Sequence, residues 1–408
     1  MKYTDVFVPG GFPQHTYNPR RDKGLEEKIE EANNNLCKLV TITGQTKSGK
    51  TVLTKKIYPK DTSIWIDGGS IKTEDDFWNS LIDKLEYFQV ESFSMIEEKS
   101  GSSSTENHLK GGIKIIEGGI KSQVTEGDKT STVSLRTKNV STKISAINAL
   151  EFYKTPLIID DFHYIERELQ GSIIRALKAP IFEGVPVLII AIPHKRYDAM
   201  KVEKEMTGRI SQVSIPIWTS EELRFIADTG FSILKEDISN KIIDYLTNEA
   251  FGSPHLMQEF CRNISKILSN GEALSKEKVE VIFSEIADNI GRPIFEKLMR
   301  GPRQRTDRIQ RKLKSGETVD IYGLILKTLA YLKPGLVSIE YEELRQGMKE
   351  ILLTQMPQIH EVARVLKTMS RIAATDESSA PVIDFDDVEK KLHITDPFFS
   401  FYLKWGKI

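Results

Sequence analysis

One run of eight residues carries the clearest chemical signal in the chain. Gly44 to Thr51 reads Gly-Gln-Thr-Lys-Ser-Gly-Lys-Thr, the pattern of a phosphate-binding loop, with an apolar stretch before it and a helix-like segment after it. The glycines allow backbone N–H groups to turn towards phosphate oxygens. We expect Lys50 to reach the β- and γ-phosphates and the Thr51 hydroxyl to bind Mg²⁺. The residues predicted to hold a nucleoside triphosphate are Gly44, Gln45, Thr46, Lys47, Ser48, Gly49, Lys50, Thr51 and Val52.

Two carboxylates further along the chain complete a possible phosphate chemistry. Asp160 and Asp161 follow the apolar residues 156–159, which read as a buried strand. In a parallel sheet the carboxyl end of each strand faces the ligand crevice. We expect Asp160 to hold Mg²⁺ opposite Thr51, and Asp161 to polarise the attacking water. An ordinary strand that ends in solvated acids is the weaker interpretation, given the loop upstream.

Composition limits the class of protein. The chain has 408 residues, 28% of them charged, and a net charge of −1, so we expect two or three soluble domains with no polyelectrolyte character. Cys37 and Cys261 match no metal or redox spacing, which favours a reducing compartment. No apolar run suits a membrane span and the first 30 residues do not resemble a signal peptide. The sequence predicts a cytoplasmic protein without membrane contact.

Alternating strands and helices place the two motifs in one sheet. The pattern predicts an α/β fold, with a parallel-sheet core covered by helices on both faces. Predicted strands occupy residues 39–42, 63–66, 156–160, 185–192 and 213–217. Residues 95–140 read as an insertion, a β-hairpin on Gly/Ser/Thr-rich flexible stems, which we interpret as a tolerated surface insertion in preference to a pore or partner-binding loop.

The pattern divides the chain into five parts. After the sheet it becomes purely helical, and a basic connector then precedes a mixed C-terminal segment. The predicted parts are an N-terminal segment with a lead-in helix (1–35), the core (36–218), a helical lid (219–299), the connector (300–319) and a winged-helix domain (320–408).

Weaker motifs gain meaning from their order. Gly208-Arg209 precedes the last strand, Gly252-Ser253-Pro254-His255 begins a helix, and an Asp-Pro-Phe run starts at Asp396. Alone, Arg209 reads as a solvated or structural arginine and Pro254 as an ordinary first-turn proline. Together with the loop and the paired aspartates, the series resembles the STAND and archaeal-ATPase branch of AAA+ P-loop NTPases, near the origin-recognition initiators.

That resemblance implies several roles. Arg209 would sense the γ-phosphate, in cis or across a subunit boundary, and Pro254 would pack near the adenine and ribose. Residues 17–28 match a region that contacts adenine. Asp161 replaces the usual Glu, which predicts slow ATP hydrolysis and a switch more than a motor, and His194 stands where a small polar sensor is usual. The resemblance also implies a homo-oligomer or a partner effector protein, for instance in bacterial defence.

Two other functions compete with the ATP-driven switch. A DNA-binding initiator or loader is indicated by the basic face of residues 358–373 and by the connector, where Arg303, Arg305 and Arg308 could neutralise phosphates. A solvated basic helix face explains the first feature equally well. A small-molecule kinase would also use a phosphate loop, but the lid, the Gly-Arg motif and the final domain argue against it.

Overall fold

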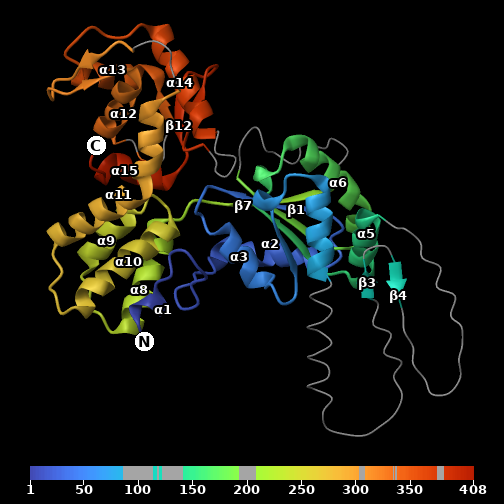
Figure 1. Cartoon of the computed structure of the whole chain (residues 1–408). Coiled ribbons are helices and arrows are strands. Elements are labelled where there is room, and N and C mark those ends of the chain that lie inside the picture. The colour runs from blue at the N-terminus through green and yellow to red at the C-terminus, as the bar shows by residue number, and fades with distance from the viewer. Residues whose placement is uncertain are drawn as a thin grey trace, which may run out of the picture.

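A computed structural model gives the architecture of the chain. It describes residues 1–85, 114–116, 119–121, 141–192, 208–302, 308–333, 335, 338–374 and 381–408. Figure 1 shows an α/β core, a cluster of helices beside it, and a C-terminal unit of helices and short strands that is joined to this cluster by a long helix. No helix within the described ranges combines the length and the apolar character needed to cross a membrane.

The core is built on five parallel strands. They are β1 (Leu39–Gly44), β2 (Ile64–Asp67), β5 (Leu157–Asp160), β6 (Val187–Ala191) and β7 (Ile210–Ile215), in the spatial order β2-β5-β6-β1-β7. Gly44 pairs with Ile215, and Asp67 pairs with Asp160. Because all the strands run the same way, these four residues lie at one edge of the sheet, as the sequence predicts for a ligand crevice.

Helices cover both faces of this sheet. The flanking helices are α2 (Leu25–Glu30), α3 (Lys50–Ile57), a helix over residues 74–85, α5 (Thr142–Tyr153) and α6 (Arg167–Phe182). Alternate strand residues supply the two cores: Val40 and Ile158 pack with α2 and α3, while Leu39 and Ile159 pack with the other three helices. Strands buried on both faces explain the continuous apolar runs in the sequence. Short 3-10 turns lie at Arg21–Lys23, Glu31–Asn33, Gly68–Ser70 and Phe162–Tyr164.

Two details differ from or extend the predicted core. The last strand begins three residues earlier than predicted and ends at Ile215, because Pro216 has no N–H to continue the ladder. In the insertion, β3 (Lys114–Ile116) and β4 (Gly119–Lys121) pair antiparallel, as a hairpin should. The other residues between 86 and 140 lie outside the described part of the chain.

The helical lid consists of α8 (Ser220–Leu234), α9 (Asn240–Glu249), α10 (Pro254–Ser269) and α11 (Lys276–Arg300). Local capping interactions fix the N-termini of two of these helices. Thr219 and Glu222 form a capping box on α8, and the Ser253 hydroxyl accepts the Leu256 N–H ahead of Pro254 in the first turn of α10.

The N-terminal segment packs on the lid more than the sequence suggested. Helix α1 (Tyr3–Val6) leads into Phe7, whose ring lies so close to Gly230 of α8 that a β-carbon there would sit 2.2 Å from it. Arg262 of α10 donates to the Phe7 carbonyl at 2.9 Å. The residues that follow, Val8 to Arg20, which we term the N-terminal strap, therefore cross between the lid and the core.

The C-terminal unit combines four helices with a three-stranded sheet. Its helices are α12 (Ile321–Leu332), α13 (Tyr341–Ile351), α14 (Ile359–Ala374) and α15 (Pro397–Trp405), and its strands are β10 (Ser338–Glu340), β11 (Ile383–Asp386) and β12 (Lys391–Ile394). The sheet order is β10-β12-β11. A small hairpin, β8 (Arg311–Lys312) with β9 (Thr318–Val319), precedes it. In α15 the Asp396 side chain caps the helix by accepting the Phe399 N–H at 2.9 Å.

Candidate nucleotide-binding site

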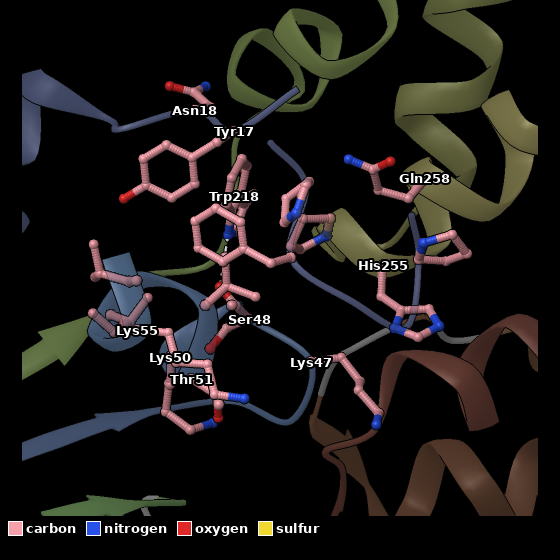
Figure 2. A pocket seen from close by; sticks show the side chains of 18 of the residues that line it. Tyr17, Asn18, Lys47, Ser48, Lys50, Thr51, Lys55, Trp218, His255 and Gln258 are labelled. Carbon is pink, nitrogen blue, oxygen red and sulfur yellow. Dashed lines mark hydrogen bonds between the residues drawn. The ribbon is translucent and has the colours of Figure 1, made fainter. Parts of the chain in front are cut away.

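A cavity of about 410 Å³ opens at the carboxyl edge of the sheet. Its walls come from the phosphate loop, the N-terminal strap, the β7–α8 connection and the start of α10 (Figure 2). Of the predicted site, the cavity is lined by Thr46, Lys47, Ser48, Gly49, Lys50, Thr51, Val52, Asp161 and Pro254. One pocket thus unites segments that lie more than 200 residues apart in sequence.

The backbone of the phosphate loop is shaped to hold an anion. Lys47 and Gly49 both have positive φ values, 60° and 89°, on either side of Ser48. Such alternation turns consecutive N–H groups into a concave nest that attracts phosphate. Gly44 is required for a different reason: a β-carbon there would lie 2.9 Å from the Cβ of Ile215 and 3.0 Å from the Ser48 hydroxyl.

Lys50 is a buried cation with only neutral hydrogen-bond acceptors. Its Nζ donates to the carbonyl oxygens of Gly44 and Gln45 at 2.8 and 2.7 Å. Burial lowers the pKa of Lys50 to about 8, although the carboxylates of Asp161 and Asp160 oppose the shift. A buried charge of this kind is costly without a counter-ion. The residue therefore fits a role in which a phosphate supplies the missing negative charge.

The carboxylates lie opposite the loop, as predicted. The Thr51 hydroxyl donates to Asp160 Oδ1 at 3.2 Å, so these two proposed Mg²⁺ ligands already face each other. Burial raises the pKa of Asp160. Burial, together with the charges of Asp160 and Asp67, raises the pKa of Asp161 to about 6. Asp161 has φ of 51°, and its side chain lines the cavity, where a water activated by it could face a bound phosphate.

The geometry suits a magnesium ion that is shared with a nucleotide. Within the described ranges, no three His, Cys, Asp or Glu side chains converge to hold a metal ion by themselves. Mg²⁺ usually takes one or two protein ligands and completes its shell with phosphates and water. Thr51 and Asp160 are the residues that would hold it, and the ion would neutralise phosphate charge.

Several cavity residues were not predicted from the sequence. The strap residues ahead of Tyr17 form part of the wall, and Gln258 of α10 holds them by accepting the Val8 N–H at 3.0 Å and donating to the Thr16 hydroxyl at 2.7 Å. Trp218 lies between the strap and the phosphate loop (Figure 2). A large aromatic residue just after a strand, at the carboxyl edge of the sheet, was the signal that could have identified Trp218.

Arg209 does not lie where a γ-phosphate sensor in cis must lie. Its carbonyl accepts the Leu39 N–H at 2.9 Å, which puts it at the amino end of β7. The six residues of β7 separate it from the cavity by about 20 Å. Its exposed guanidinium stacks 5.9 Å from the Phe182 ring centroid instead. The prediction of a cis contact is therefore wrong, because a residue that precedes a parallel strand begins at the far edge of the sheet.

The connector arginines are only partly described. Arg308, predicted to neutralise DNA phosphates, forms a salt bridge with Asp320 at 2.5 Å, donates to the Pro302 carbonyl, and stacks on Tyr322. The Arg308 guanidinium is thus already engaged within the fold, and its contact with DNA phosphates stays a prediction. Arg303, Arg305 and His194, which stands in place of the usual small polar sensor, lie outside the described residues.

A third part of the chain approaches the phosphate loop. Lys47 extends away from the sheet towards α15 (Figure 2), and its Nζ lies 5.8 Å from the Phe398 ring centroid. The His255 ring of α10 meets the same phenyl ring edge-on, with the centroids 5.0 Å apart. Burial, and then the charge of Lys47, lowers the pKa of His255 to about 4, so this imidazole is neutral at pH 7.

The sheet order, the phosphate loop and the carboxylates define an AAA+-type P-loop fold with a helical lid. Comparison with solved structures agrees. A Walker-type ATPase of Pyrococcus abyssi is 18% identical, with a TM-score of 0.53 and 98% of this chain and 97% of that chain covered. The ADP form of the ORC2 protein of Aeropyrum pernix is 12% identical, with a TM-score of 0.50 and coverage of 96% and 93%. No protein-family model and no curated protein sequence matches the chain.

These likenesses establish the fold. The chain shares the architecture of Walker-type and origin-recognition ATPases across nearly its whole length, as its sequence motifs predicted. At these identities its activity has to be argued from the site.

Proposed function

We propose that the chain binds Mg²⁺-ATP in this cavity and acts as a nucleotide-dependent conformational or assembly switch. The loop nest and Lys50 would hold the phosphates, Thr51 and Asp160 the Mg²⁺, and Asp161 would activate water for slow hydrolysis. The lid would close on the nucleotide through Pro254. The output would be engagement of a partner effector protein or of further copies of the chain, for instance in bacterial defence.

One observation favours a nucleotide-dependent switch over a site that only binds nucleotide. Lys47 at the tip of the phosphate loop, His255 of the lid and Phe398 of the C-terminal unit form a single cluster, so the loop adjoins the two parts that would move. We regard the C-terminal unit as a winged helix that rests on the core at this point. Nucleotide phosphates would enter directly beside this contact.

The energies favour release when phosphate arrives. A cation–π contact near the surface contributes about 0.5–1 kcal/mol. A charge-assisted hydrogen bond from the same lysine to a phosphate oxygen contributes about 1.5–3 kcal/mol. A triphosphate that reaches Lys47 would therefore withdraw it from Phe398 and loosen the C-terminal unit, whereas a diphosphate that leaves Lys47 in place would not.

The test measures size and shape as functions of nucleotide. With a non-hydrolysable ATP analogue, we expect light scattering and small-angle X-ray scattering to report a defined oligomer or an extended monomer. With Mg²⁺-ADP, we expect a monomer whose C-terminal unit stays packed on the core. In Phe398→Ala, we expect the analogue concentration at the midpoint to fall about 2- to 5-fold, because the contact opposing the change is lost.

Phe152→Ala is a matched control, since it removes an exposed aromatic ring from α5 on the core. Its midpoint should equal that of the wild type. Identical mass and scattering profiles in the two nucleotides would contradict the switch, even if both nucleotides bind. In an assembled form, we propose that Arg209 serves the nucleotide of a neighbouring copy, the trans role that its position leaves open.

A DNA-binding initiator or loader is the second candidate, and α14 is the observation that favours it. Arg364, Lys367 and Arg371 project from its exposed face, opposite the buried Val362 and Leu366. Lys367, however, pairs with Asp387 at 2.7 Å. The hairpin beside it carries four acidic side chains against two lysines: Asp384, Asp386, Asp387, Glu389, Lys390 and Lys391. Because these acidic side chains would oppose DNA phosphates, we rank DNA binding below the nucleotide-dependent switch.

If duplex DNA is bound, we expect the double substitution Arg364→Ala and Arg371→Ala to weaken binding at least 10-fold in low salt and to flatten its salt dependence. Fluorescence anisotropy with a labelled duplex measures this. Lys235→Ala with Lys241→Ala, on the exposed face of the lid, is the charge-matched control. Wild-type protein that leaves the anisotropy unchanged at low salt would eliminate this candidate.

A further inference from the structure

The indole of Trp218 occupies a central place in the cavity that the phosphate chemistry does not explain. Trp218 follows β7 after only two residues, and Figure 2 shows it between Tyr17 and Asn18 of the strap and Ser48 of the phosphate loop. Gln258 and His255 of α10 line the same cavity. Trp218 is only partly buried, so ring surface remains available to a ligand.

The orientation of this ring is fixed from two directions. Its Nε1–H donates to the Ser48 carbonyl at 2.9 Å, which ties the indole to the phosphate loop itself. The Arg20 guanidinium stacks on the ring with Cζ 4.8 Å from the centroid. A ring held in this way loses little freedom when a ligand stacks on it.

Arg20 is in turn immobilised. Its side chain is 3% exposed, and it donates to Glu222 Oε1 at 2.8 Å and to the carbonyls of Pro216 and Ile217 at 3.1 and 3.3 Å. These partners flank Trp218 in sequence: Pro216 and Ile217 lie in the connection from β7 to α8, and Glu222 lies in the first turn of α8. Glu222 therefore holds Arg20, Arg20 lies over the indole, and both Arg20 and Trp218 line the cavity.

The lining of the cavity is chemically mixed. Lys50 and Asp161 are charged and Thr51 is polar, whereas Ile226, Pro254 and Trp218 supply apolar surface. A nucleotide whose phosphates lie in the loop nest must place its base on the apolar side. Planar bases stack favourably on aromatic rings, and a purine offers more area than a pyrimidine.

We propose that Trp218 is the stacking surface for a purine base, and that Arg20 and Glu222 are positioning residues that hold its indole. This assignment rests on the proposed nucleotide binding and adds the residue that distinguishes a nucleotide from a bare polyphosphate. Through its bond to Ser48, Trp218 also links the base to the phosphate loop.

The experiment compares two probes that differ by the nucleoside. Mg²⁺-ADP and inorganic tripolyphosphate are titrated into full-length wild type, Trp218→Leu and Trp218→Phe by calorimetry. We expect Trp218→Leu to bind ADP at least 10-fold more weakly and tripolyphosphate within 2-fold of wild type. Trp218→Phe retains an aromatic face without the indole N–H and should recover most of the ADP affinity.

Fluorescence gives an independent readout. Trp218 is one of four tryptophans in the chain. We expect ADP to quench the emission of wild type and of the control Trp405→Phe, but not that of Trp218→Phe, while tripolyphosphate quenches none of the three. Glu222→Gln, which weakens the hold on Arg20, should lower the ADP affinity and leave tripolyphosphate binding unchanged.

The outcomes distinguish failure of the base-stacking role of Trp218 from failure of the proposed nucleotide binding. Equal losses for ADP and tripolyphosphate in Trp218→Leu would mean that the indole only supports the loop through Ser48, and would overturn the base assignment. Unchanged ADP affinity would overturn it as well. A wild-type protein that binds neither probe would instead remove the nucleotide site itself, and the base assignment with it.

Discussion

Replacing Lys50 with alanine is expected to lower the affinity for Mg²⁺-ATP and Mg²⁺-ADP by about 100-fold or more. The ammonium group is buried beside the loop nest with two carbonyl oxygens as its acceptors, so phosphate is the counter-charge that this position lacks. Loss of charge-assisted hydrogen bonds to phosphate at a buried site removes about 1.5–3 kcal/mol for each bond. Isothermal titration calorimetry measures the change directly.

Alanine at this position also leaves two carbonyls without their donor, so the loop itself could rearrange. Lys50→Met keeps the aliphatic stem and most of the volume, and should lose affinity to the same extent. Lys60→Ala, on the exposed connection before β2, controls for charge and should bind like wild type. Retained affinity in a folded Lys50→Met protein, checked by circular dichroism, would refute the site assignment.

The second large effect is expected at Asp161. Asp161→Asn should slow ATP hydrolysis about 100-fold or more while ATP affinity stays within a few-fold of wild type, because a positioned general base contributes about 10²–10⁴ in rate. Asparagine is nearly isosteric and tolerates the left-handed backbone that Asp161 adopts, at φ of 51°. The substitution therefore removes the carboxylate and leaves the backbone conformation at residue 161 unchanged. Single-turnover hydrolysis measures the rate.

A variant that binds ATP without hydrolysing it should also accumulate the ATP-bound conformation. Light scattering after incubation with ATP should give for Asp161→Asn the state that wild type reaches only with a non-hydrolysable analogue. Asp61→Asn, an exposed aspartate before β2, is the control. Hydrolysis at the wild-type rate would show that Asp161 is not the water-activating group.

The contrast between Lys50 and Arg209 shows which interpretations of the sequence could succeed. Lys50 belongs to a contiguous loop whose backbone geometry follows from its own glycines, so its place in the site was predictable. The interpretation of Arg209 depended on resemblance, and strand direction excludes the contact in cis that it included. In a parallel sheet, the residue before a strand and the residue after it lie at opposite edges.

The sequence by itself determined the parts whose cause is local. These are the phosphate loop, the apolar strands with Asp160 and Asp161 at the end of one of them, and the start of α10 at Pro254. Hydrophobic periodicity and turn chemistry act over a few residues, and their pattern is therefore visible in the chain itself.

Only the tertiary structure decided the rest of the site. Trp218 meets Ser48 across 170 residues, Arg20 meets Glu222 across 202, and Arg308 forms a salt bridge with Asp320. Lys47 meets Phe398 from the opposite end of the chain. Such contacts are fixed by how the lid and the C-terminal unit pack against the core, and no local sequence pattern encodes which side chains that packing brings together.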